Sequence, residues 1–165
     1  MEYVDKFDNK RRKINKVTER YDEISGEYRQ SMHIWIQNSK KEFLIQKRAK
    51  TKKIYPGMWA TTGGGVDKGE TTLDTVVREL KEELGIDVNL QNVELILSFK
   101  RDYDFVDVYL LKMDIDLHNI VMQEEELDEV KWVNEEELKN LWENGLFTDS
   151  NMFYYDFLKK VIQSY

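Results

Sequence analysis

The segment 64–86 constrains the fold of this chain more than any other, because it joins a glycine run to one strongly amphipathic helix. Residues 72–84 are rich in helix formers and contain neither Gly nor Pro. Apolar side chains recur there at helical spacing and predict one buried stripe. The stripe consists of Leu73, Val76, Val77, Leu80 and Leu84. Thr71 or Thr72 can cap the start of the helix, and Gly85 stands where a left-handed residue ends many helices.

Three glutamates of the same helix form an acidic cluster. Glu79, Glu82 and Glu83 lie at positions i, i+3 and i+4, so they are expected together on the face opposite the stripe. Like charges this close repel one another, and a divalent cation would remove the repulsion. Carboxylate oxygens are ligands that Mg²⁺ and Mn²⁺ prefer. The alternative is a solvated acidic surface, but the adjacent glycine run favours a ligand site.

Gly63, Gly64 and Gly65 precede the helix. Glycine can adopt positive φ and lets the backbone approach a ligand closely. A bare carbonyl, such as that of Gly63, could add an oxygen ligand beside the carboxylates. The loop and the acidic cluster are therefore expected to converge on one place.

The same segment resembles a known family signature. It fits the pattern Gly-x5-Glu-x7-Arg-Glu-apolar-x-Glu-Glu-x-Gly-apolar at every constrained position, which is the pattern of the Nudix box. The matching residues are Gly64, Glu70, Arg78, Glu79, Leu80, Glu82, Glu83, Gly85 and Ile86. The resemblance implies an α/β (α+β) fold, with helices on both faces of a mixed sheet. It also implies hydrolysis of a nucleoside diphosphate linked to a second group, with Mg²⁺ or Mn²⁺ as cofactor.

The resemblance also assigns roles to residues. Glu79 and Glu83 would bind the metal, Glu82 would be a further ligand or support a second metal, and the Gly63 carbonyl would complete the site. The remaining positions of the signature would support its structure. Those supporting residues are Gly64, Glu70, Arg78 and Gly85.

The general base is left open between two positions. Glu79 is one candidate. The other lies in the run Glu124, Glu125 and Glu126, which precedes a predicted strand, with Glu126 as first choice; a solvated charge run is the alternative.

Arg48, with Lys47 beside it, is expected to hold the diphosphate. Trp59 could stack on a base, although a core position is the simpler interpretation.

A looser resemblance links residues 1–145 to the Nudix subgroup that is related to isopentenyl-diphosphate isomerase. It rests on the strand that ends in Gln46-Lys47-Arg48, on a basic loop, and on Pro56-Gly57-Met58-Trp59 before the glycine run. Those isomerases use a Cys and a Glu, and this chain has no Cys. The expectation is therefore hydrolase chemistry, with isomerase activity and a non-catalytic nucleotide sensor as the alternatives.

Composition limits the other possibilities. A chain of 165 residues fits a single domain over 1–165, and its net charge of −7 argues against nucleic acid or anionic membranes as partners. The expected partner is a small-molecule diphosphate. The lack of a signal-peptide core and of a long apolar run favours a cytoplasmic enzyme. A homodimer is possible through aromatic residues at 153–155, which are expected to be exposed.

The pattern along the chain predicts a mixed order of strands and helices. Residues 1–28 form an N-terminal extension, with a hairpin of strands 2–7 and 13–21. Further strands are predicted over 31–37, 42–48, 58–62, 93–101, 105–113 and 128–133. Helices are predicted over 72–84, after the cap Asn134 as far as 145, and over 149–163. This order favours a central sheet with helices on both faces.

Overall fold

Two strands that are buried on both faces form the centre of the sheet. In the computed structural model, which describes residues 3–20, 22 and 26–163, β3 (Arg29–Gln37) pairs in parallel with β8 (Asp104–Lys112). Side chains alternate between the faces, so that Met32 and Ile34 enter one core and Trp35 enters the other. Burial on both faces explains why these strands read as nearly continuous apolar runs.

The other strands extend this centre into a seven-stranded mixed sheet. They are β4 (Phe43–Arg48), β5 (Trp59–Ala60), β6 (Thr62–Gly65), β7 (Val93–Lys100) and β9 (Leu127–Val133). The order is β5-β4-β3-β8-β7, while β6 pairs antiparallel with β3 and β9 antiparallel with β4. The glycine run is thus itself a strand, and not only a loop that leads into the helix.

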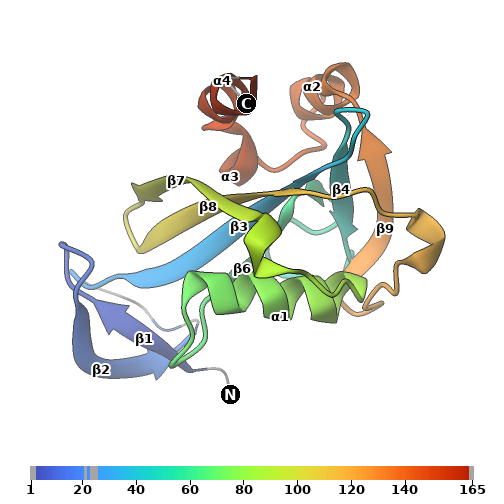
Figure 1. The fold of residues 1–165 in the computed structure, drawn as a ribbon. Coiled ribbons are helices and arrows are strands. Elements are labelled where there is room, and N and C mark those ends of the chain that lie inside the picture. The colour runs from blue at the N-terminus through green and yellow to red at the C-terminus, as the bar shows by residue number, and fades with distance from the viewer. Residues whose placement is uncertain (1–2, 21, 23–25, 164–165) are drawn as a thin grey trace.

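Helices cover both faces of the sheet (Figure 1). The helix α1 (Thr72–Leu84) packs on one face, and the others lie on the opposite face. Those others are α2 (Glu135–Glu143), α3 (Asp149–Met152) and α4 (Tyr155–Gln163). Two short 3-10 helices, η1 (Leu90–Asn92) and η2 (Leu117–Asn119), lie in connections. The predicted α+β sandwich with a mixed sheet is confirmed.

The helix α1 begins and ends at the predicted residues. Thr71 is the N-cap and forms a capping box with Asp74, and Gly85 ends the helix at φ 69°. One member of the predicted stripe was wrong, because Val77 is 37% exposed while Val76 and Leu80 are fully buried.

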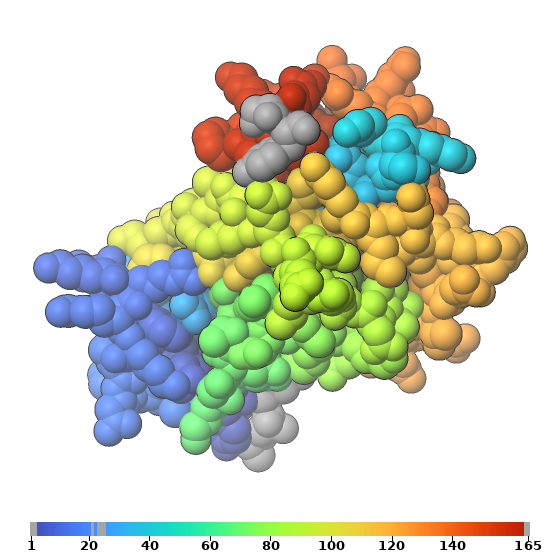
Figure 2. All heavy atoms as spheres, viewed as in Figure 1, coloured from blue at the N-terminus to red at the C-terminus, as the bar shows by residue number. Residues whose placement is uncertain are grey.

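The N-terminal hairpin consists of β1 (Tyr3–Phe7) and β2 (Lys13–Glu19); the predicted strand ends at residues 2 and 21 lie outside the described residues. Figure 2 shows the hairpin packed beside the segment that leads into α1. Asp5 Oδ2 accepts a hydrogen bond of 2.8 Å from the Gly69 amide. Arg11 from the hairpin turn donates two hydrogen bonds to the Asp107 carboxylate in the sheet. The hairpin is thereby anchored at both ends.

The C-terminal region differs from its prediction. The expected single helix over 149–163 divides into α3 and α4. Tyr154 and Tyr155, expected to be exposed, are buried in the core with Trp35, whereas Phe153 is exposed. The predicted aromatic surface for a homodimer is therefore reduced to Phe153 at these positions. Among the described residues, no helix has the length and apolarity needed to cross a membrane.

Candidate active site

The glycine strand β6 is the shared wall of two cavities. The acidic cavity, of about 380 Å³, is lined by Glu79, Glu82, Glu83 and Glu126. The tyrosine cavity, of about 370 Å³, is lined by Tyr55 and Tyr103 and by the start of α3. Gly63, Gly64, Gly65 and Arg48 line both cavities. A ligand that crosses the edge of β6 could therefore occupy the two at once.

Gly64 gives Glu79 the space to reach the wall of the acidic cavity. A Cβ atom on Gly64 would lie 2.1 Å from Glu79 Oε1 and 2.9 Å from Glu79 Cγ, so a larger residue would displace this side chain. The expectation that the glycine run uses positive φ was wrong, since Gly63–Gly65 are extended and the described glycines with positive φ lie elsewhere. Glycine is required at position 64 because the Glu79 side chain lies too close for a Cβ atom, and not because of its backbone conformation.

Glu83 is buried beside the core, although its helical spacing predicts the face opposite the apolar stripe. It is only 4% exposed, and Gln46 Nε2 donates a hydrogen bond of 2.7 Å to its Oε2. Gln46 is itself fixed, because its Oε1 accepts a hydrogen bond from Thr62 Oγ1. Burial, and then the nearby Glu79 carboxylate, raise the pKa of Glu83 to about 8.

Arg78 joins the acidic helix to the loop before it. Its Nε donates to Glu70 Oε1 at 2.9 Å, and its Nη1 donates to Glu79 Oε1 at 2.8 Å and to Glu82 Oε2 at 3.2 Å. Its Nη2 donates to the Gly65 carbonyl. Arg78 therefore positions Glu79 while Glu70 fixes Arg78.

The carboxylates of the acidic cavity fit a divalent cation by their chemistry. Among the described residues no group of three acidic or histidine side chains already has the arrangement of a metal site. Instead, Arg78 holds Glu79 and Glu82, while Gln46 holds Glu83. Burial raises the pKa of Glu79 despite the opposing effect of Arg78, and the pKa of Glu83 is raised as well. A divalent cation, which prefers oxygen ligands, would stabilise the ionised forms of the buried Glu83 and the half-buried Glu79.

The raised pKa of Glu83 predicts how the stability of the metal-free protein depends on pH. Between its ordinary value of 4.5 and about 8, the folded protein holds a proton on Glu83 that the unfolded chain has lost. The free energy of unfolding must therefore fall as pH rises through this window, by on the order of 2 kcal/mol, or several degrees in Tm. Calorimetry in EDTA at pH 5, 6.5 and 8 checks this, and a Glu83→Gln variant should flatten the curve. An equally steep fall in that variant would contradict the assignment to Glu83.

Of the run Glu124–Glu126, only Glu126 lines the acidic cavity among the described residues. Lys52 Nζ forms an ion pair with its carboxylate. Glu124 and Glu125 are exposed. Lys52 also lines the acidic cavity and is therefore part of the site.

The structure separates the three residues expected to bind substrate. Arg48 lines both cavities, and its Nε donates to the Ile54 carbonyl at 3.0 Å. Lys47 does not line either cavity; it neighbours Arg48 on β4, and its Nζ lies 5.7 Å from the centroid of the Trp59 ring. Trp59 is buried in the core, with Lys131 Nζ 4.4 Å from its ring. Strand alternation explains the separation, because neighbours on a strand point to opposite faces.

His33 is a buried residue on the wall of the tyrosine cavity to which the sequence assigns no role. Its Nδ1 lies 2.9 Å from the Tyr154 hydroxyl, which also accepts a hydrogen bond from Trp35 Nε1. Burial lowers the pKa of His33 to about 3. The imidazole therefore stays neutral at physiological pH and is not suited to serve as a general acid.

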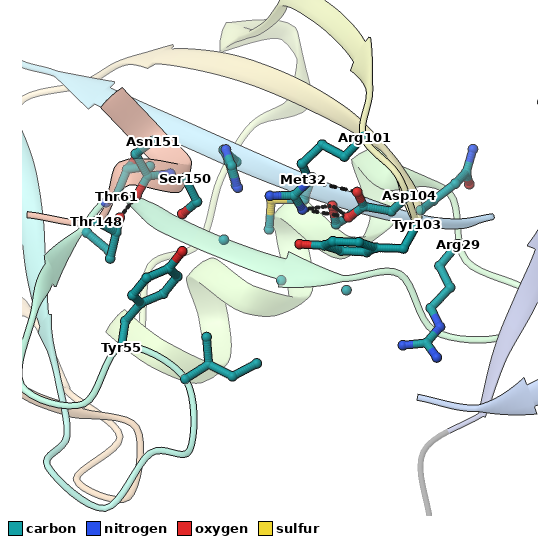
Figure 3. Close-up of a pocket in the computed structure, with 18 of the residues that line it drawn as sticks. Arg29, Met32, Tyr55, Thr61, Arg101, Tyr103, Asp104, Thr148, Ser150 and Asn151 are labelled. Carbon is teal, nitrogen blue, oxygen red and sulfur yellow. Dashed lines mark hydrogen bonds and ion pairs between the residues drawn. The ribbon is translucent and has the colours of Figure 1, made fainter. Parts of the chain in front are cut away.

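The tyrosine cavity carries several arginines, although the chain as a whole is acidic. Figure 3 shows Arg101 above the ring of Tyr103, with Arg29 on the far side and Tyr55 facing them from its own loop. Arg101 is paired with Asp104. Sequence reasoning missed this cavity, because its residues come from distant segments and match no local pattern.

Comparison with known proteins agrees with this arrangement. The family model of the NUDIX domain matches residues 27–153. The chain belongs to the Nudix family. It is thus a pyrophosphohydrolase of a family whose members generally need divalent metal ions.

Three proteins illustrate what this chain is similar to. A Nudix hydrolase of Listeria innocua is 36% identical over 123 residues, which are 74% of this chain and 73% of that protein. The nucleoside triphosphatase NudI of an Enterobacter species is 29% identical over 109 residues, covering 60% of this chain and 77% of that one. A crystal structure from Deinococcus radiodurans, 21% identical, aligns over 89% of this chain and 92% of its own with a TM-score of 0.76, and shows the shared fold. These findings do not support the isomerase-related subgroup.

Proposed function

We propose that this Nudix enzyme cleaves the diphosphate linkage of a nucleoside diphosphate derivative, by attack of water on phosphorus, with Mg²⁺ or Mn²⁺ as cofactor. The observation that carries the proposal is a pair of carboxylates, the buried Glu83 and the half-buried Glu79, in a cavity that shares its glycine wall with an arginine-bearing cavity. The name of the Enterobacter relative, a nucleoside triphosphatase, supports a nucleotide substrate.

The residues of the acidic cavity have different roles in this proposal. Glu79 and Glu83 would hold the cation, with Glu82 and the Gly63 carbonyl as further oxygen donors. When bound, the cation neutralises diphosphate charge and makes the attacking water more acidic. Arg78 keeps Glu79 at the glycine wall.

Arg48 would bind the diphosphate where the two cavities meet, and its position on the wall of both cavities supports this role. A guanidinium there offers paired N–H donors to phosphate oxygens. Glu126 is our proposal for the residue that accepts the proton of the attacking water, and Glu79 is the alternative.

Mass analysis of products in ¹⁸O-labelled water tests the reaction. A panel of nucleoside diphosphate derivatives and triphosphates is incubated with Mg²⁺ or Mn²⁺. The proposal predicts two phosphorylated products, or a monophosphate and orthophosphate, with the label on phosphorus. Label in an alcohol product, or no turnover of any nucleotide with either cation, would overturn it.

A glutamate-to-glutamine pair tests the general base. Glu126→Gln should lower kcat by about 100-fold or more with little change in KM, because removal of a positioned base costs about two to four orders of magnitude. Glu124→Gln, at an exposed position outside the cavity, is the matched control and should keep activity within about two-fold. Equal activity of the two variants would shift the role to Glu79.

A further inference from the structure

At the turn between β7 and β8, beside the tyrosine cavity, Asp104 holds Arg101, and Arg101 lies over the ring of Tyr103. Asp104 is buried and accepts hydrogen bonds from Arg101 Nε at 2.7 Å, from Arg101 Nη2 at 2.6 Å and from Ser31 Oγ at 2.6 Å. The two bonds to Arg101 hold its guanidinium plane in a fixed orientation. The backbone is also fixed, since the Arg101 amide donates to the Asp104 carbonyl at 2.8 Å.

Arg101 covers one side of the Tyr103 ring. Its Cζ lies 5.1 Å from the ring centroid, within the range of a cation–π contact. The Tyr103 carbonyl accepts a hydrogen bond of 3.0 Å from the Arg29 amide, which fixes the residue from the other direction. Yet Tyr103 remains 52% exposed and lines the cavity. The result is a rigid aromatic surface, supported on one side and open on the other.

Tyr55 lines the same cavity from a separate loop and lies across from the hydroxyl edge of Tyr103. In Figure 3 the hydroxyl groups of Tyr55 and Tyr103 point into the same space. Tyr55 has φ 52°, an uncommon conformation for a bulky residue, in the turn before Pro56 and Gly57. The same loop is tied to the site, because the Ile54 carbonyl accepts the hydrogen bond from Arg48.

A supported, open aromatic ring in a cavity with arginines favours a flat ligand that carries phosphate. An aromatic base stacks on such a ring regardless of its identity, whereas a sugar or an inorganic phosphate gains little from it. Arg48 lies on the wall toward the acidic cavity, where a phosphate attached to that base would lie.

We therefore propose that the tyrosine cavity binds the nucleoside portion of the substrate, with its base stacked on the open face of Tyr103. This inference rests on the proposed function and specifies which end of the substrate lies there. Arg101 and Asp104 are positioning residues, since they act by fixing Tyr103. Tyr55 lines the same cavity beside the hydroxyl edge of Tyr103.

Binding measurements test this without turnover. Isothermal titration compares adenosine and uridine 5′-monophosphates with ribose 5-phosphate, which has no base, in EDTA. At least one nucleotide should bind the wild-type protein about ten-fold more tightly than ribose 5-phosphate, as expected for one stacked base. Tyr103→Leu should remove that difference and leave ribose 5-phosphate binding unchanged, while Tyr103→Phe should keep it.

Phe157→Leu is the matched control, because Phe157 is 51% exposed on α4 and does not line the cavity. It should bind all three compounds as the wild type does, and circular dichroism checks the fold of each variant. Equal affinity of the wild type for nucleotides and ribose 5-phosphate, or a preference that survives Tyr103→Leu, would overturn the proposal. Because no hydrolysis is measured, nucleotide binding through Tyr103 without turnover would instead count against the proposed reaction alone.

Discussion

Glu83→Gln will lower kcat/KM by about 1,000-fold or more, a loss typical of removing a charged group that holds a catalytic cation. The substitution keeps the shape of the side chain, and its amide oxygen can still accept the hydrogen bond from Gln46 Nε2. The fold should therefore be retained. In EDTA at pH 8 the variant should even be more stable than the wild type, because a buried ionised carboxylate has been removed.

Loss of the charge should lower kcat/KM and raise the stability of the variant. Misfolding would lower both, so the two measurements together distinguish these causes. Steady-state kinetics with saturating Mg²⁺ or Mn²⁺ measures kcat/KM, and calorimetry measures the stability. Glu125→Gln, at an exposed position outside the acidic cavity, is the matched control and should leave both unchanged. A Glu83→Gln enzyme with activity within about ten-fold of wild type would contradict the assigned role.

Gly64→Ala should cause the second large loss, of about 100-fold or more, by moving Glu79 out of place. The new Cβ would lie 2.5 Å from Glu79 Cδ as well as 2.1 Å from Oε1, so the whole end of the side chain must shift. Alanine is otherwise compatible with the extended backbone of β6, and the melting temperature should change little. Kinetics and calorimetry on the purified variant provide the measurement.

Gly65→Ala gives a comparison within the same strand. Its Cβ would meet Arg20 Nη1, the terminal atom of a flexible side chain, so a smaller loss is expected. A double variant tests the cause: Gly64→Ala added to Glu79→Gln should cost little beyond Glu79→Gln alone, because both act through one carboxylate. Full additivity of the two losses would show that Gly64 acts by another route.

The sequence predicts most of the fold because its local signals agree with one another. The N-cap of α1 at Thr71, one of its two candidates, the left-handed Gly85 and the apolar strands each act within a few residues, and each is found where expected. The same holds for Asn134 as the cap of α2. Local chemistry of this kind does not depend on the rest of the molecule.

The details that the sequence misses depend on tertiary packing. Helical spacing places Glu83 opposite the stripe, but β6 and Gln46 cover that side and bury it. Strand alternation predicts that Gln46 and Arg48 point to one face of the sheet and Lys47 to the other. Applied to the sequence, it would have excluded Lys47 from the site. No spacing pattern in the sequence predicts that Arg101 contacts Tyr103. Nor does any predict that Tyr55, from a distant loop, lines the same cavity.

Diffraction from crystals soaked in Mn²⁺ tests the central claim most directly, because the anomalous signal of the ion identifies it without any assay. The account predicts a peak in the acidic cavity within about 2.0–2.6 Å of carboxylate oxygens of Glu79 and Glu83. The peak should be absent from crystals of Glu83→Gln soaked in the same way. An ion bound elsewhere, with both carboxylates still held by Arg78 and Gln46, would contradict it.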